Sequence, residues 1–358
     1  MGIAEQWQAF RTVCAAPIPA TFLALAAMQS AIVITIQSIV LNNWLGWLLP
    51  NAFQGPSSDT VATNLFLLIF GLGFELLYVY DAILSRSTVQ VVLSCLLNAG
   101  LTILAVIQIP QVGDAVVSLK SSYDINADPV VNHDFEFWTV SSGLLIAIVA
   151  VLALFSLVLP VAAWYLRVYF SWQSYRNVNP DARLRRSRLV HQSYVMLVKL
   201  DVYFIVCFIV IYCVLVLRAV GIEFVLHVVG ALSAIAILVL SIWSSKTEHR
   251  LGMSFAIVVY IGGLAYFIYR LITVYSPGPD HFRYGSASRL LTIYGGLGMI
   301  FFTLTIVNAV YCMLNFGSGL KMFLKDYEEG WKPARQSALE LPIQYTQYNR
   351  SMERDLDS

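Results

Sequence analysis

The stretch FWTVSSGLLIAIVAVLALFSLVLPVAAWYL, residues 137–166, contains no Asp, Glu, Lys or Arg. An α-helix rises about 1.5 Å per residue and the hydrocarbon core of a bilayer is about 30 Å thick, so this stretch is long enough to cross a membrane. Lipid offers no hydrogen-bond partners to backbone N–H and carbonyl groups, which favours a helix over an open strand. The stretch therefore predicts a transmembrane helix.

Apolar stretches of similar length lie on both sides of this one. The eight predicted spans are about 19–41, 62–80, 89–109, 137–166, 195–217, 223–242, 251–275 and 290–314. The composition agrees, because 58% of the 358 residues are hydrophobic and only 12% are charged, against about 25% charged in soluble domains. We predict an all-α, polytopic transmembrane bundle over residues 1–316 and a largely disordered cytoplasmic tail over residues 317–358.

The segments between the first spans are expected to leave the helical bundle. Asn42–Pro50, with Trp44 and Trp47, is expected to lie in the membrane–water interface, where tryptophan is enriched. A non-cytoplasmic loop is expected from about Pro110 to Glu136, between the third and fourth spans. Small residues are expected to mark close helix contacts, at Gly71, Gly73, Gly230, Ala234, Gly262, Gly263, Gly295, Gly296 and Gly298.

The orientation follows from the distribution of basic residues, which gather on the cytoplasmic side of membrane proteins. Of the 22 Lys and Arg residues, Arg167, Lys199 and Arg270 fall in or at the edges of spans. The others divide fifteen to four in favour of the side that holds both termini. We therefore expect both the N- and C-termini to be cytoplasmic. This orientation depends on a short turn at Arg218–Ile222 being a true loop.

Ionisable and polar residues inside spans are costly and are candidates for function. Those expected toward the cytoplasmic side are Glu75, Asp81, Arg167, Lys199, Asp201 and Asn308. They are predicted to form a charge network that either locks the helices together or lines a vestibule for a polar substrate or proton. Glu75 is the strongest candidate, because its short stem cannot easily reach the interface. Arg270, toward the opposite side, is expected to extend its guanidinium to the interface.

A basic cluster at the cytoplasmic end of the fifth span is formed by Arg183, Arg185, Arg186 and Arg188. Such a cluster can bind anionic lipid head groups, although the positive-inside rule supplies the same residues without any ligand. The expected partners are the bilayer and anionic lipids at its cytoplasmic face. Nucleic acid is not expected, because the net charge is only +1.

The sequence lacks the local motifs of common enzymes. It contains no HExxH, GxSxG or phosphate-binding loop, and its five histidines are spread over separate segments. The five cysteines form no CxxC pair. We therefore predict no enzymatic activity, no cofactor and no metal site.

Four stretches taken together resemble a known family. They are LYVYDAI (residues 77–83) with Gln90 beyond it, SYRNVNPDARLRR (174–186) running into VMLVKLDVYF (195–204), AYFIYRLITVY (265–275) and NFGSGLK (315–321). This pattern resembles an uncharacterised fungal family of multi-pass Golgi apparatus membrane proteins. The resemblance implies a fungal source and a Golgi or other endomembrane address. It implies no activity, since none is established for the family.

Several functions remain open from the sequence. A non-enzymatic scaffold or trafficking factor fits the missing catalytic motifs best. A transporter or channel for a small polar solute or ion would use the cytoplasmic-side charges around Glu75. A seven-helix-type receptor is a further alternative, and it would require an odd number of spans.

Overall fold

The computed structural model describes residues 16–49, 56–122, 129–132, 136–177, 182–216, 222–275 and 288–316. In these ranges it contains eight helices long and apolar enough to cross a membrane. They are α2 (Pro17–Trp47), α3 (Pro56–Ser85), α4 (Thr88–Lys120), α5 (Phe137–Asn177), α6 (Ala182–Ile211) with the short π-helix η1 (Tyr212–Val216), α7 (Ile222–Lys246), α8 (Arg250–Tyr275) and α10 (Ser288–Leu314). The predicted all-α fold with eight spans is confirmed. The predicted tail and residues 218–221 of the predicted turn at Arg218–Ile222 lie outside the described residues.

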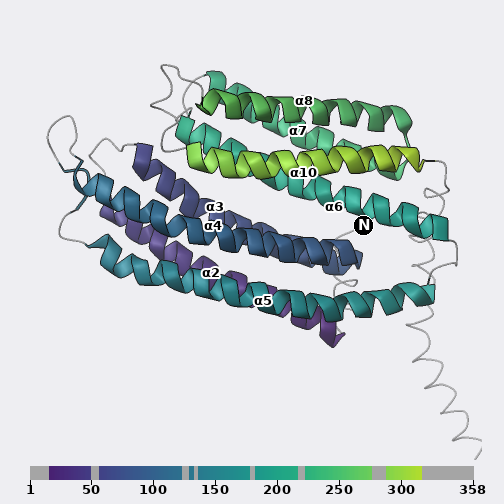
Figure 1. Cartoon of the computed structure of the whole chain (residues 1–358), viewed down its shortest axis with the longest axis horizontal. Coiled ribbons are helices and arrows are strands. Elements are labelled where there is room, and N and C mark those ends of the chain that lie inside the picture. Colours follow the sequence, from purple (N-terminus) through teal and green to yellow (C-terminus); the bar gives the residue numbers. More distant parts are fainter. Residues whose placement is uncertain are drawn as a thin grey trace, which may run out of the picture.

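The eight helices form two groups of four (Figure 1). In the N-terminal group, α2, α3, α4 and α5 pack against one another, and in the C-terminal group α6, α7, α8 and α10 do the same. The groups meet where α3 and α4 contact α6 and η1. One hydrophobic cluster continues across this boundary, from Val33 and Leu68 to Phe204 and Phe302. The halves therefore share a packed core.

The end of α2 differs from the sequence-based expectation. The helix continues to Trp47, and Trp44 and Trp47 are fully buried by protein contacts. Both indoles pack on Phe137 of α5, with ring centroids 5.1 and 5.6 Å apart. The backbone of the segment 130–132 closes over this end, where the Asn132 amide donates to the Trp47 carbonyl at 3.0 Å. The segment after the first predicted span is thus helical as far as Trp47, because aromatic packing extends the helix. Its position in the membrane–water interface stays a prediction.

The helix α4 also extends beyond its predicted end and continues past Pro110 to Lys120. A proline removes one backbone donor and normally ends or kinks a helix. Here the residues on either side, Gln108 and Val112, are both buried, and the last two turns contribute Val116 and Leu119 to the cluster around Trp47. The prediction of a loop from Pro110 is wrong, because burial of these apolar residues favours continued helix.

The predicted close contacts at small residues hold at some positions only. A Cβ at Gly71 would lie 2.6 Å from Leu101 Cδ2, and one at Gly295 would lie 2.7 Å from Leu271 Cδ1. By contrast, no atom lies within 4 Å of the Cβ position at Gly230 or Gly262. The first two glycines permit tight packing, whereas the second two border open space.

Candidate functional site

The candidate site is the seam between the two groups, formed by one face of α3 and one face of α6. Phe70, Phe74, Tyr78 and Asp81 recur every three or four residues, so they lie on the same side of α3. The Tyr78 hydroxyl donates to the carbonyl of Met196 in α6 at 3.4 Å. The helical spacing therefore places aromatic and charged groups of α3 in one row against α6.

One end of the seam is closed by an ion pair. Lys199 Nζ contacts Asp81 Oδ2, and the two side chains are 31% and 42% exposed. Gln90 Nε2 donates to the same carboxylate oxygen at 2.7 Å and to the Tyr78 carbonyl at 2.9 Å. The pair joins the N-terminal group to the C-terminal group, and Gln90 of α4 orients the carboxylate.

Further along the seam, Tyr203 of α6 stacks between aromatic rings of α3. Its ring centroid lies 4.7 Å from that of Phe74 and 5.8 Å from that of Phe70. Gly71 makes this approach possible, because a Cβ there would lie only 2.9 Å from the Tyr203 hydroxyl oxygen. Tyr203 is 2% exposed, so the seam is closed by packing at this depth.

Glu75, the strongest sequence candidate, is buried inside the N-terminal group. Its Oε1 accepts a hydrogen bond of 2.9 Å from Asn98 Nδ2, and Asn98 Oδ1 accepts one of 2.7 Å from Ser156 Oγ. Ser156 Oγ is also 2.8 Å from Thr102 Oγ1. Glu75 Oε2 has no hydrogen-bond partner among the described residues. The result is a polar network that links α3, α4 and α5.

Asp201 occupies a separate position, although it is only two residues from Lys199. Lys199 contacts Asp81 of α3, whereas Asp201 is fully buried near Thr305 of α10. The Thr305 hydroxyl lies 2.9 Å from the Phe301 carbonyl, to which it donates. Neither carboxylate oxygen of Asp201 has a hydrogen-bond partner in the described part of the chain. Asp201 is therefore a second buried acid, inside the C-terminal group.

The remaining predicted residues lie apart from these contacts. Arg167 is exposed on α5, where its guanidinium lies 5.6 Å from the Trp164 ring centroid. Asn308 is half-buried on α10, and none of the hydrogen bonds above includes it. Arg186 is exposed in the first turns of α6, and the side chains of Arg183, Arg185 and Arg188 lie outside the described part. The structure brings together Asp81 and Lys199, but not all six residues of the predicted network.

Sequence reasoning missed the polar partners of Glu75. Asn98 and Ser156 lie within apolar stretches, and a polar side chain in such a stretch requires a partner. Their positions alone do not say which helix supplies it. Among the described residues, no group of three His, Cys, Asp or Glu side chains is arranged to hold a metal ion. The arrangement provides hydrogen bonding and ion pairing between helices.

Comparison with known proteins gives one informative match. The chain is 24% identical over 278 residues to a UPF0658 Golgi apparatus membrane protein of Schizosaccharomyces pombe, and the match covers 74% of this chain and 78% of that protein. No protein-family model matches the chain, and no solved structure matches it. The similarity confirms the resemblance noted from the sequence. With eight candidate spans, it supports a multi-pass location in the Golgi or another endomembrane.

Proposed function

We propose that the chain is a non-enzymatic scaffold or trafficking factor of the Golgi or another endomembrane. The seam between α3 and α6 carries this proposal, because its charged and aromatic residues contact one another across the two groups. A scaffold needs a body that keeps its shape, and interhelical polar contacts in lipid help to fix how helices pack. The Asp81–Lys199 pair and the Glu75 network serve that purpose.

The surroundings of the acids also support a structural role. Glu75 is 2% exposed and Asp201 is 0% exposed. The structure has a cleft between α6, α7, α8 and α10 and a smaller hollow beside Trp164. Glu75, Asp201 and Asp81 line neither of them. A transported solute would need a polar path to these side chains. Closed packing around them favours the scaffold.

A flux measurement on reconstituted protein tests the proposal. Purified full-length chain in phospholipid vesicles should pass protons, Na⁺ and K⁺ no faster than protein-free vesicles do. In cells that lack the chain, Glu75→Gln should reach the same membrane location and the same level as the unmodified chain does. A protein-dependent flux that Glu75→Gln abolishes would overturn the scaffold proposal.

One observation favours the second candidate, a transporter or channel. Three buried carboxylate oxygens, Glu75 Oε2 and both of Asp201, have no hydrogen-bond partner among the described residues, and such groups in a membrane are costly and usually functional. On this alternative, Glu75→Gln and Asp201→Asn each reduce flux while the purified protein stays folded. We do not propose a seven-helix-type receptor, because the described residues hold eight candidate spans.

A further inference from the structure

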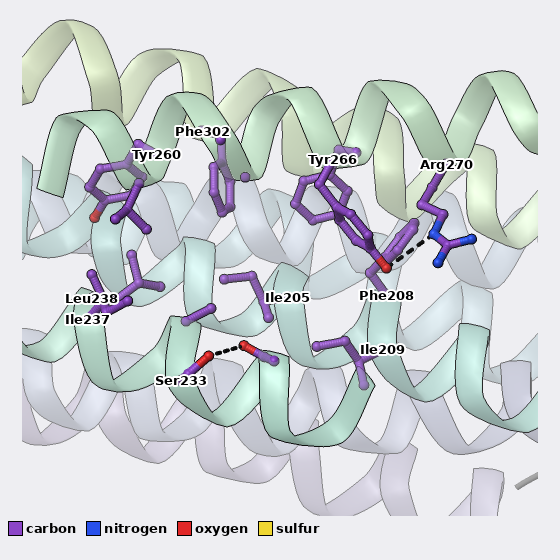
Figure 2. A pocket seen from close by; sticks show the side chains of 16 residues that line it. Ile205, Phe208, Ile209, Ser233, Ile237, Leu238, Tyr260, Tyr266, Arg270 and Phe302 are labelled. Atoms are coloured by element: carbon purple, nitrogen blue, oxygen red, sulfur yellow. Dashed lines mark hydrogen bonds between the residues drawn. The ribbon is translucent and has the colours of Figure 1, made fainter. Parts of the chain in front are cut away.

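The C-terminal group contains an apolar cleft of about 660 Å³ between α7 and α8, with α6 and α10 at its base (Figure 2). Buried aromatic rings of α6, α8 and α10 form its base, and Phe208, Phe267 and Phe302 are each less than 5% exposed. The volume falls within the range of about 300–1,000 Å³ that is usual for small-molecule sites. The cleft is therefore large enough to hold a ligand.

Two glycines keep the cleft open. Gly230 of α7 and Gly262 of α8 both border it, and the space at their Cβ positions is empty to 4 Å. Both residues are exposed, so the cleft opens on the outer surface of the bundle. Ser233, on the same wall, donates its hydroxyl to the Gly230 carbonyl at 2.7 Å, and the wall therefore stays apolar. In a membrane, such a surface faces lipid.

The position of the cleft matches one leaflet of the bilayer. It runs along α8 from Tyr260 to Arg270, which is about 15 Å at 1.5 Å per residue. The hydrocarbon core is about 30 Å thick, so one leaflet spans about 15 Å. Since α8 begins at Arg250 and ends at Tyr275, Tyr260 lies near its middle and Arg270 near its end. With the middle of α8 at the membrane centre, the cleft extends from near that centre toward the head groups, which the long Arg270 side chain can reach.

A cation surrounded by tyrosines marks the outer end of the cleft. The Arg270 guanidinium carbon lies 4.8 Å from the Tyr212 ring centroid and 5.7 Å from that of Tyr269. Arg270 Nε donates to the Tyr266 hydroxyl at 3.2 Å, as the dashed line in Figure 2 shows. Guanidinium groups bind phosphate with well-defined geometry, and tyrosine is typical of the head-group region. The charge at this end complements a phospholipid.

We propose that this cleft binds one glycerophospholipid, with an acyl chain along α7 and α8 and the phosphate beside Arg270. The apolar walls, the leaflet-matched length and the terminal cation fit the two parts of such a molecule. This site is distinct from the basic cluster at the start of α6, and it does not depend on the scaffold proposal.

Photo-crosslinking in lipid nanodiscs tests the proposal on the full chain. A phosphatidylcholine with a diazirine in one acyl chain should give adducts concentrated on the α7 and α8 residues that line the cleft. Gly262→Leu and Gly230→Leu each place a side chain in the open space. Because each leucine occupies the space that the acyl chain would fill, and the displaced chain moves into the surrounding lipid, most of the labelling there should be lost. Gly296→Leu on α10 is the matched control, because its Cβ position is also open but it does not border the cleft.

A second probe separates phosphate recognition from chain binding. Arg270→Gln should reduce labelling by the phosphatidylcholine probe and leave labelling by the matching diazirine diacylglycerol unchanged. Gel filtration and thermal unfolding identify any variant that misfolds, and the two cleft glycines lie on different helices, so each checks the other. Adducts spread evenly over all lipid-facing helices, or equal labelling in wild type and both cleft variants, would show ordinary surrounding lipid and overturn the proposal.

Discussion

The N-terminal and C-terminal groups both contain four helices, yet the contacts around Glu75 and the contacts beside the cleft differ in kind. In the N-terminal group, Glu75, Asn98 and Ser156 form a hydrogen-bonded network between three helices. In the C-terminal group, Phe267 meets Phe208 and Phe302 edge to face, with ring centroids 4.8 and 5.3 Å apart. The cleft lies in the C-terminal group, beside these rings.

The seam combines both kinds of contact. Tyr203 stacks on Phe74 in the middle, and Lys199 pairs with Asp81 at one end. Packing lies deep in this interface and the charges are partly exposed. We therefore expect the packing contacts to contribute more stability than the ion pair. Substitutions at Gly71, Asn98 and Lys199 compare the packing, the Glu75 network and the ion pair in turn.

The largest effect is expected at Gly71, where α3 packs closely against α4 and α6. Gly71→Ala adds a Cβ that would lie 2.6 Å from Leu101 Cδ2 and 2.9 Å from the Tyr203 hydroxyl. Overpacking of this kind should lower the free energy of unfolding by about 1–3 kcal/mol. Thermal and denaturant unfolding in detergent micelles measure the change.

Gly73→Ala is the matched control for that substitution. Gly73 is two residues away on the same helix, and its Cβ position is empty to 4 Å. Alanine there should leave stability unchanged or raise it by about 0.5–1 kcal/mol, because it favours helix. Equal destabilisation by both substitutions would show that close packing at the seam does not explain the Gly71 effect.

A smaller effect is expected from the polar network. Asn98→Ala removes the donor to Glu75 and the acceptor for Ser156. The free energy of unfolding should fall by about 1 kcal/mol, which is the usual contribution of interhelical hydrogen bonds in membranes. Ser156→Ala should cost less, because Glu75 keeps its hydrogen bond from Asn98. In the double variant the two losses should be less than additive. Full additivity would contradict a linked network.

The smallest effect is expected at the ion pair. Lys199→Met should change the free energy of unfolding by about 0–1 kcal/mol, because both partners are partly exposed and are screened by water and salt. The change should shrink further as salt concentration rises. Arg167→Met on α5 is the control, since it removes an exposed cation outside the seam. If Lys199→Met lowered stability more than Gly71→Ala did, the ranking of the seam contacts would be reversed.

Much of the fold follows from the sequence, because apolar stretches of more than 20 residues have few other stable structures. The exceptions have local causes. Pro110 is a helix-breaking signal, and burial of Val112 and its neighbours overrides it. Trp44 has the sequence pattern of an interfacial tryptophan, and the sequence does not show that it packs on Phe137. Both depend on contacts between distant segments, which local patterns do not contain.

The candidate site was predictable in part for the same reason. Glu75, Asp81, Lys199 and Asp201 stand out as charges within or near apolar stretches. The choice of partners depends on how the helices pack, so Lys199 meets Asp81 while Arg167 remains on the outside of α5. In the sequence, only its glycines mark the cleft. Glycine is not a specific signal for a cleft, because Gly71 and Gly295 lie at tight contacts instead.

Water access to position 75 tests the central claim, that the polar network around Glu75 is closed to water and holds the helices together. A Glu75→Cys variant would be treated in membranes with a membrane-impermeant thiol reagent and compared with Ser85→Cys, which lies exposed at the end of the same helix. The closed interior predicts labelling of Ser85→Cys and none at position 75 above the level of the unmodified chain. Labelling of Glu75→Cys at a rate close to that of Ser85→Cys would reveal an aqueous path and contradict the account.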